Sequence, residues 1–197
     1  MQTEIEAKWL NIDKDAFRKV LVDAGAKLMV PERQIVRQVY DFPDGILGSI
    51  GGWVRVRNEG HVITMSYKQL NDRTLHGTKE VTVVVRDFDI ACSFLESIGL
   101  ESKSIQETKR ESWKLDDVEI EIDTWPWIPS FVEIETNSEA ALKQTAELLK
   151  LDFAMALHGS VEIAYQAVYD FTEQEIDSWK EIRFIDVPDW LSSKKLK

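Results

Sequence analysis

Charged and aliphatic residues alternate one by one in four separate stretches of the chain: residues 4–8, 55–57, 119–123 and 133–135. Side chains two residues apart share one face of a β-strand, so each stretch predicts a strand with a charged face and an aliphatic face. An open sheet whose charged face meets water produces this pattern. A barrel whose charges point inward, and whose aliphatic face is covered by helices, produces it as well. The alternation alone leaves both arrangements open.

Taken over its whole length, the sequence predicts eight strands, which include the four stretches above: residues 2–10, 27–42, 53–58, 61–69, 78–86, 104–114, 117–124 and 130–136. Apolar residues at helical spacing predict helices at residues 14–24, 87–98, 139–150, 161–169 and 173–185. The helices fall between groups of strands rather than after every strand, which favours an antiparallel closed barrel over a parallel sheet. We therefore expect an α+β fold, an eight-stranded antiparallel β-barrel with helices packed outside.

No linker, repeat or low-complexity tract divides the 197 residues. We expect residues 1–170 to form the barrel domain, and residues 171–197 to add a C-terminal helix and tail that pack on the same domain. The segment Trp125-Pro126-Trp127-Ile128-Pro129 is stiff, because proline restricts the backbone. It fits either the rim of a binding site or a hydrophobic plug at one end of the barrel.

The net charge of −11 argues against a nucleic-acid partner and against docking on anionic membranes. The single cysteine, Cys92, allows no internal disulfide and fits a reducing, cytoplasmic compartment. Three scattered histidines show no zinc-ligand spacing. Any metal would therefore be held by carboxylates, which favours Mg²⁺ or Mn²⁺.

If the charged faces point inward, the interior is lined by charges of both signs: Glu4, Glu6, Lys8, Arg55, Arg57, Lys68, Glu80, Arg110, Glu119, Glu121, Asp123, Glu133 and Glu135. Such a lining cannot be a dry core, because unpaired buried charge is costly. It suits a metal-chelated polyphosphate, with carboxylates on the metal and basic side chains on the phosphate oxygens. The competing interpretation is the solvated face of a β-sandwich.

Several motifs occur in order: Glu4-Ile5-Glu6-Ala7-Lys8, then residues 53–57 (WVRVR), 64–68 (TMSYK) and 131–135 (FVEIE). Together they resemble the CYTH family, which comprises class IV adenylyl cyclases, thiamine triphosphatases and other triphosphate tunnel metalloenzymes. The resemblance implies an eight-stranded antiparallel tunnel with charged interior walls.

The resemblance also implies roles for individual residues. The carboxylates that resemble the family's metal ligands, for Mg²⁺ or Mn²⁺, are Glu4, Glu6, Glu80, Asp123, Glu133 and Glu135. The residues that resemble its triphosphate clamp are Lys8, Arg55, Arg57, Lys68 and Arg110. Tyr40 and Lys68 resemble a catalytic pair that assists the leaving group.

The chain departs from the family pattern at four places. Thr78 and Thr82 stand where the family strand carries an arginine and a second glutamate. Thr108-Lys109-Arg110 replaces a Lys-x-Arg motif, and Tyr40-Asp41-Phe42 shortens a Tyr-Tyr-Asp segment. A metal ligand or a clamp contact is therefore in doubt.

Three functions fit these observations. A metal-dependent phosphohydrolase acting on a small-molecule triphosphate (tripolyphosphate, a nucleoside triphosphate or thiamine triphosphate) is favoured by Tyr40 and Lys68. An adenylyl cyclase is the alternative, because the helix expected at residues 14–24 resembles the cyclase branch. A non-catalytic triphosphate-binding module is the third, in view of Thr78 and Thr82. A homodimer is left open.

Overall fold

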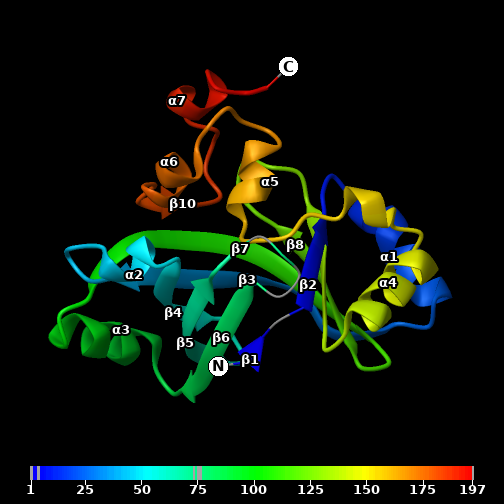
Figure 1. The fold of residues 1–197 in the computed structure, drawn as a ribbon, viewed down its shortest axis with the longest axis horizontal. Coiled ribbons are helices and arrows are strands. Elements are labelled where there is room, and N and C mark those ends of the chain that lie inside the picture. The colour runs from blue at the N-terminus through cyan, green and yellow to red at the C-terminus, as the bar shows by residue number, and fades with distance from the viewer. Residues whose placement is uncertain (1, 4, 73, 75–76, 197) are drawn as a thin grey trace.

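The computed structural model describes residues 2–3, 5–72, 74 and 77–196 (Figure 1). Within them one sheet contains β1 (Gln2–Thr3), β2 (Ile5–Trp9), β3 (Lys27–Asp41), β4 (Gly52–Asn58), β5 (Ile63–Leu70), β6 (Thr78–Val85), β7 (Glu101–Leu115), β8 (Val118–Thr124), β9 (Phe131–Thr136) and β10 (Glu181–Ile182). The strand order is β1-β6-β5-β4-β3-β7-β8-β9-β2, and β10 pairs with β7. All pairs are antiparallel except the parallel β10–β7 pair.

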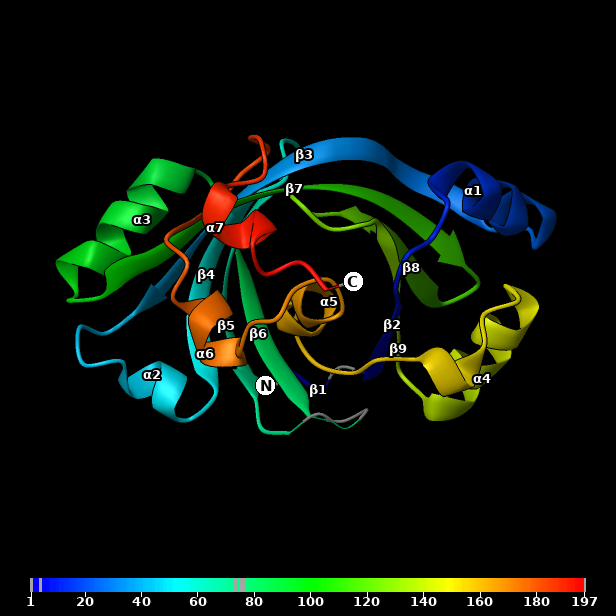
Figure 2. The same cartoon turned by 90° about the horizontal axis from the view of Figure 1, so that it is seen from above.

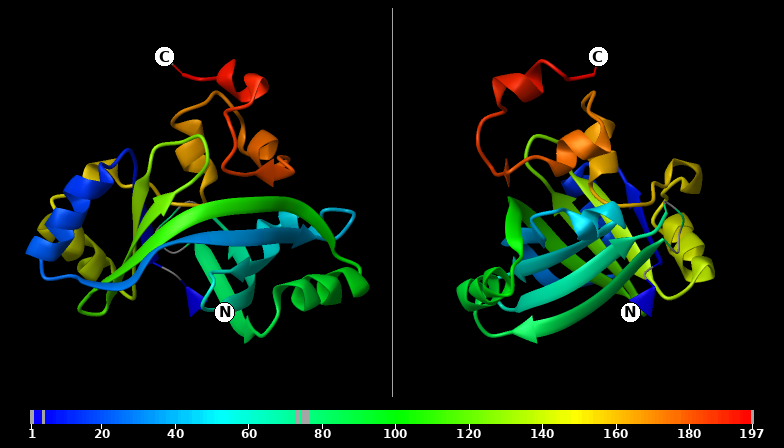
Figure 3. Two further views of the ribbon diagram at one scale, coloured as in Figure 1. Left: turned by 180° about the vertical axis from the view of Figure 1, so that it is seen from behind. Right: turned by 60° about the vertical axis from the view of Figure 1, so that its left-hand side comes forward.

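The two ends of the sheet come from neighbouring parts of the N-terminal segment. β1 pairs with β6, and β2 pairs with β9 at the other end. The sheet is therefore curled around an interior, and β3 and β7 run along its whole length as two long curved strands (Figure 3). This confirms the predicted eight-stranded antiparallel sheet, in which β1 and β2 correspond to one predicted strand and β10 is an addition.

Two helices cover the outer face of β2, β8 and β9. They are α1 (Lys14–Asp23), capped by Asp13, and α4 (Glu139–Leu148), capped by Ser138. The apolar cluster beneath them contains the apolar alternate residues of the strands and the buried residues of the helices: Ile5, Ala7, Trp9, Ile120, Ile122, Val132, Ile134, Phe17, Leu21, Leu142 and Ala146. Since alternate residues point to opposite faces, the charged residues of these strands point to the interior.

A second helix-covered face lies on β3 and β4. There α3 (Phe88–Ser97), capped by Asp87, buries Ala91, Cys92 and Leu95 against Val56. The short α2 (Ile46–Ser49) precedes β4. No helix in the described part of the chain has the length and apolarity needed to cross a lipid bilayer.

The C-terminal segment contains η1 (Phe153–Met155), α5 (Glu162–Gln166), α6 (Glu173–Asp177) and α7 (Asp189–Ser192). Figure 2 shows α5 and α6 above the space enclosed by the sheet. An aromatic cluster fixes them: the Trp179 ring lies edge-on to the rings of Tyr165 (5.2 Å), Phe171 (5.3 Å) and Trp190 (5.2 Å). The predicted helix at residues 173–185 is wrong beyond Asp177, because the chain there turns to pair β10 with β7.

Candidate functional site

The curled sheet and the C-terminal segment enclose a cavity of about 660 Å³. Its walls carry charged side chains from eight strands and from residues 160–182. Twelve of the thirteen charges expected in the interior line it: Glu6, Lys8, Arg55, Arg57, Lys68, Glu80, Arg110, Glu119, Glu121, Asp123, Glu133 and Glu135. The thirteenth, Glu4, lies outside the described residues. The alternating stretches are therefore the inner wall of a curled sheet, and not the solvated face of a sandwich.

Three carboxylates gather where β2 meets β9. Each of Glu6, Glu133 and Glu135 offers an oxygen atom, and these atoms all lie within 4.8 Å of one another. The register explains this placement, because Glu6 is paired with Glu135 and Lys8 with Glu133. The Lys8 ammonium lies 3.1 Å from Glu6 Oε1 and 3.0 Å from Glu133 Oε2.

The pKa values of two of these carboxylates are shifted in opposite directions. Despite its burial, the pKa of Glu133 is held at about 2 by Lys8 and Arg110. Burial, together with the negative charge of Glu133, raises the pKa of Glu135 to about 7. Lys8 and Arg110 thus favour the ionised form of Glu133, but the negative charge around Glu135 is not fully offset. An all-oxygen donor set with excess negative charge fits a hard divalent cation such as Mg²⁺ or Mn²⁺.

Two other predicted metal ligands form ion pairs apart from this group. Asp123 accepts two hydrogen bonds from Arg110, at Nε (2.7 Å) and Nη2 (2.6 Å). Glu80 lies 3.2 Å from Arg55 Nη2 and 3.1 Å from Lys68 Nζ, and it accepts a hydrogen bond from Thr82. Both carboxylates are therefore paired in this structure with residues that the sequence predicts as the triphosphate clamp.

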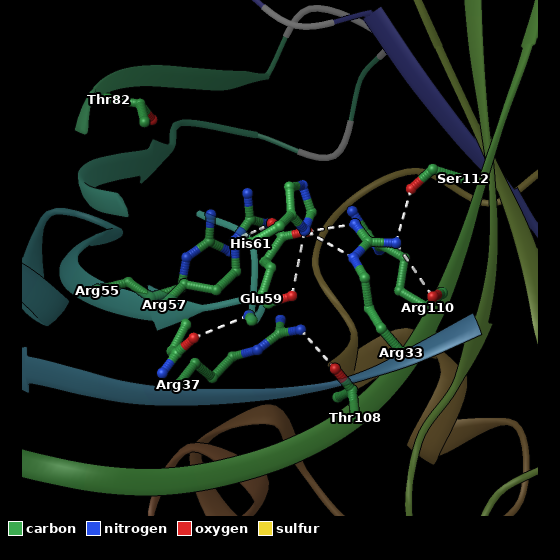
Figure 4. Close-up of polar contacts among 12 residues, drawn as sticks. Arg33, Arg37, Arg55, Arg57, Glu59, His61, Thr82, Thr108, Arg110 and Ser112 are labelled. Carbon is green, nitrogen blue, oxygen red and sulfur yellow. Dashed lines mark hydrogen bonds and ion pairs between the residues drawn. The ribbon is translucent and has the colours of Figure 1, made fainter. Parts of the chain in front are cut away.

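Five arginines line the same cavity: Arg33, Arg37, Arg55, Arg57 and Arg110 (Figure 4). They share one face because β3 lies between β4 and β7, with Arg37 paired to Arg57 and Arg33 paired to Arg110. Burial and the neighbouring Arg55 lower the pKa of Arg57 to about 10. The buried Nε atom of Arg55 has no hydrogen-bond partner among the described residues. This wall is short of negative charge, as an anion-binding wall would be.

Glu59, at the turn after β4, organises two of these arginines (Figure 4). Its Oε1 lies 2.9 Å from Arg57 Nε, and its Oε2 accepts a hydrogen bond from Arg33 Nε at 3.1 Å. Arg33 also donates to Ser112 Oγ (2.9 Å) and to the Arg110 carbonyl (3.1 Å). Arg33 is therefore held in place by the protein itself.

Sequence reasoning missed Arg33, Arg37 and Glu59. The signal for the two arginines is weak, because Arg33 and Arg37 share one face of the predicted strand at 27–42 but Ile35 stands between them on that face. Glu59 gives no such signal, since it follows the strand in a turn.

Tyr40 borders the cavity, but its hydroxyl lies among the residues of α3, where it donates to Glu96 Oε1 (3.3 Å). Its ring belongs to the apolar cluster with Ala91 and Leu95. The geometry therefore gives no support to a catalytic pair of Tyr40 and Lys68.

A family model described as the CYTH domain matches residues 2–161. The chain belongs to the CYTH family. No curated protein matches it. The CYTH match ends at residue 161, so the residues of α5, α6 and β10 that line the cavity follow the matched range.

Solved structures share the CYTH fold at low identity. A candidate adenylate cyclase from Vibrio parahaemolyticus is 21% identical with a TM-score of 0.71, covering 84% of this chain and 98% of that chain. A Pyrococcus horikoshii protein is 19% identical with a TM-score of 0.65, covering 78% of this chain and 93% of that one. A candidate adenylyl cyclase from Hippeastrum, described as having a dominant triphosphatase activity, is 12% identical with a TM-score of 0.59, covering 90% and 95%.

Proposed function

We propose that this CYTH protein is a metal-dependent phosphohydrolase that acts on a triphosphate bound inside the curled sheet. The observation that carries the proposal is the division of one cavity into a carboxylate wall and an arginine wall. A polyphosphate chelated to a divalent cation has the complementary charge on each side.

The carboxylate wall would hold the metal through Glu6, Glu133 and Glu135. A divalent cation bound there supplies charge neutralisation at a phosphoryl group and lowers the pKa of a coordinated water. Lys8 lies between Glu6 and Glu133 and would bind a phosphate oxygen from the same side. Glu4, whose role the family resemblance implies, remains a predicted ligand.

The arginine wall would bind the phosphate oxygens. Arg55, Arg57 and Arg110 have planar guanidinium groups that match phosphate oxygens in pairs. Their carboxylate partners Glu80, Glu59 and Asp123 hold them in place before the substrate arrives. Phosphoryl transfer relies on such preorganised positioning and electrostatic stabilisation more than on a covalent nucleophile.

Product analysis tests the proposal. The purified protein is given inorganic tripolyphosphate, ATP and thiamine triphosphate separately, with Mg²⁺ or Mn²⁺. Release of orthophosphate is expected and would rank the substrates. Cyclic AMP with pyrophosphate from ATP would instead make the protein an adenylyl cyclase, the alternative that the Vibrio parahaemolyticus neighbour suggests. Tight binding without turnover would contradict both enzymes and favour a binding module.

A further inference from the structure

Arg37 differs from the other arginines of the cavity because it has no carboxylate partner among the residues that the structure describes. Among the described residues, Glu59 forms ion pairs with Arg33 and Arg57, Glu80 pairs with Arg55, and Asp123 pairs with Arg110. Arg37 takes part in none of these pairs, and its Nε has no hydrogen-bond partner in the described part of the chain. Arg37 lines the cavity, and only 5% of the residue's surface is exposed to solvent.

Two contacts hold the Arg37 guanidinium in a fixed orientation. Its Nη2 donates to Thr108 Oγ1 on the neighbouring strand β7 at 2.7 Å (Figure 4). Its central carbon lies 4.7 Å from the centre of the Trp125 ring, in a cation–π contact. Neither contact neutralises the charge.

The surroundings of Arg37 make the unpaired charge costly. Burial and the positive charges of Arg55 and Arg57 lower the pKa of Arg37 well below its ordinary value. An uncompensated buried charge destabilises a fold, and a hydrophobic side chain of similar size would be favourable at this position. An anion in the cavity removes this cost.

We propose that Arg37 is a substrate-binding residue that donates to a phosphoryl oxygen of the triphosphate, with Thr108 and Trp125 orienting its guanidinium. This inference rests on the proposed function and assigns to it a cation on β3 that the motifs do not indicate. Arg33, on the same strand, is excluded from this role because all three nitrogen atoms of its guanidinium already donate to Glu59, Ser112 or the Arg110 carbonyl, whereas Arg110 uses only Nε and Nη2 for Asp123.

The test uses Arg37→Met, which keeps most of the side-chain volume and removes the charge. Binding of inorganic tripolyphosphate is measured by calorimetry, and thermal melting is recorded without ligand. Loss of a charged hydrogen bond predicts affinity weakened roughly 10- to 100-fold. The variant is expected to melt at the same temperature as the unsubstituted protein or higher. Arg18→Met is the matched control, because Arg18 pairs with Glu111 outside the cavity.

A second variant separates binding from packing. Thr108 contacts the guanidinium from the adjacent strand, so Arg37→Met with Thr108→Lys returns a cation to the same part of the cavity. Recovery of at least part of the lost affinity is expected. Unchanged affinity in Arg37→Met would overturn the inference, as would a lower melting temperature without recovery by Thr108→Lys. If the unsubstituted protein itself fails to bind tripolyphosphate, the proposed function fails instead.

Discussion

At the scale of single residues, the site depends on carboxylates that each lie close to more than one positively charged side chain. Glu133 lies 3.0 Å from Lys8 Nζ and 3.7 Å from Arg110 Nη2, and it also belongs to the candidate metal group. It therefore connects the two walls of the cavity. A cation is also found beside Thr108, which stands where the family resemblance implies a lysine. There the guanidinium of Arg37, on the neighbouring strand β3, donates a hydrogen bond to the Thr108 hydroxyl.

Glu133→Gln is expected to reduce triphosphate turnover by at least about 100-fold, because it removes charge from the proposed metal ligands and leaves the shape unchanged. Melting should change little, since Lys8 keeps its pair with Glu6. Phosphate release and thermal melting measure the two effects. Glu32→Gln is the control, because Glu32 pairs with Lys14 away from the cavity. Unfolding of Glu133→Gln would show that Glu133 is mainly a structural ion-pair residue.

At the scale of elements, the C-terminal segment places further carboxylates over the cavity. Glu162 on α5 lines it together with Glu173 and Asp177 of α6. Burial and the negative charge of Asp177 raise the pKa of Glu162 to about 8. Ser160 donates a hydrogen bond to Glu162 Oε2. We therefore expect the packing of α5 on α6 to depend on the protonation of Glu162.

The sign of this effect follows from proton binding. Between pH 5 and 8 the folded protein keeps the Glu162 proton, whereas the unfolded chain releases it. The free energy of unfolding should therefore fall as pH rises through this range, by at most about 1.4 kcal/mol per pH unit. Glu162→Gln should reduce this fall, and Glu181→Gln in β10 should not. Denaturant unfolding at several pH values measures both. Equal slopes for Glu162→Gln and the unsubstituted protein would contradict the assignment.

At the scale of the whole molecule, the cavity concentrates charge that the fold must tolerate without substrate. Burial raises the pKa of Glu121 to about 7, as it does for Glu135. A ligand of complementary charge that binds the folded state alone must raise its stability.

Mg²⁺ or Mn²⁺ at about 100 times its dissociation constant should stabilise the fold by about 2.7 kcal/mol. Thermal melting with and without the ion measures this, and a chelator should reverse it. Glu135→Gln should abolish most of the stabilisation, because Glu135 belongs to the carboxylate group. Full stabilisation of that variant would place the metal elsewhere.

The sequence by itself determined the inner wall of the fold. Alternation assigned charged residues of β2, β4, β8 and β9 to one face, and the family motifs indicated that this face is the interior. It also predicted the capped helices α1, α3 and α4, because capping residues and apolar spacing are local signals. The roles of the individual site residues stay predictions.

Only the tertiary structure decided which charges are partners. Asp123 and Glu80 pair with arginines or lysine, and Tyr40 turns toward α3, because strand register and tilt fix those distances. The chain after Asp177 leaves its helical pattern to add β10 to the sheet. Arg37 is distinguished by the partner it lacks among the described residues. Such a property arises from contacts between distant segments, which a local sequence pattern does not encode.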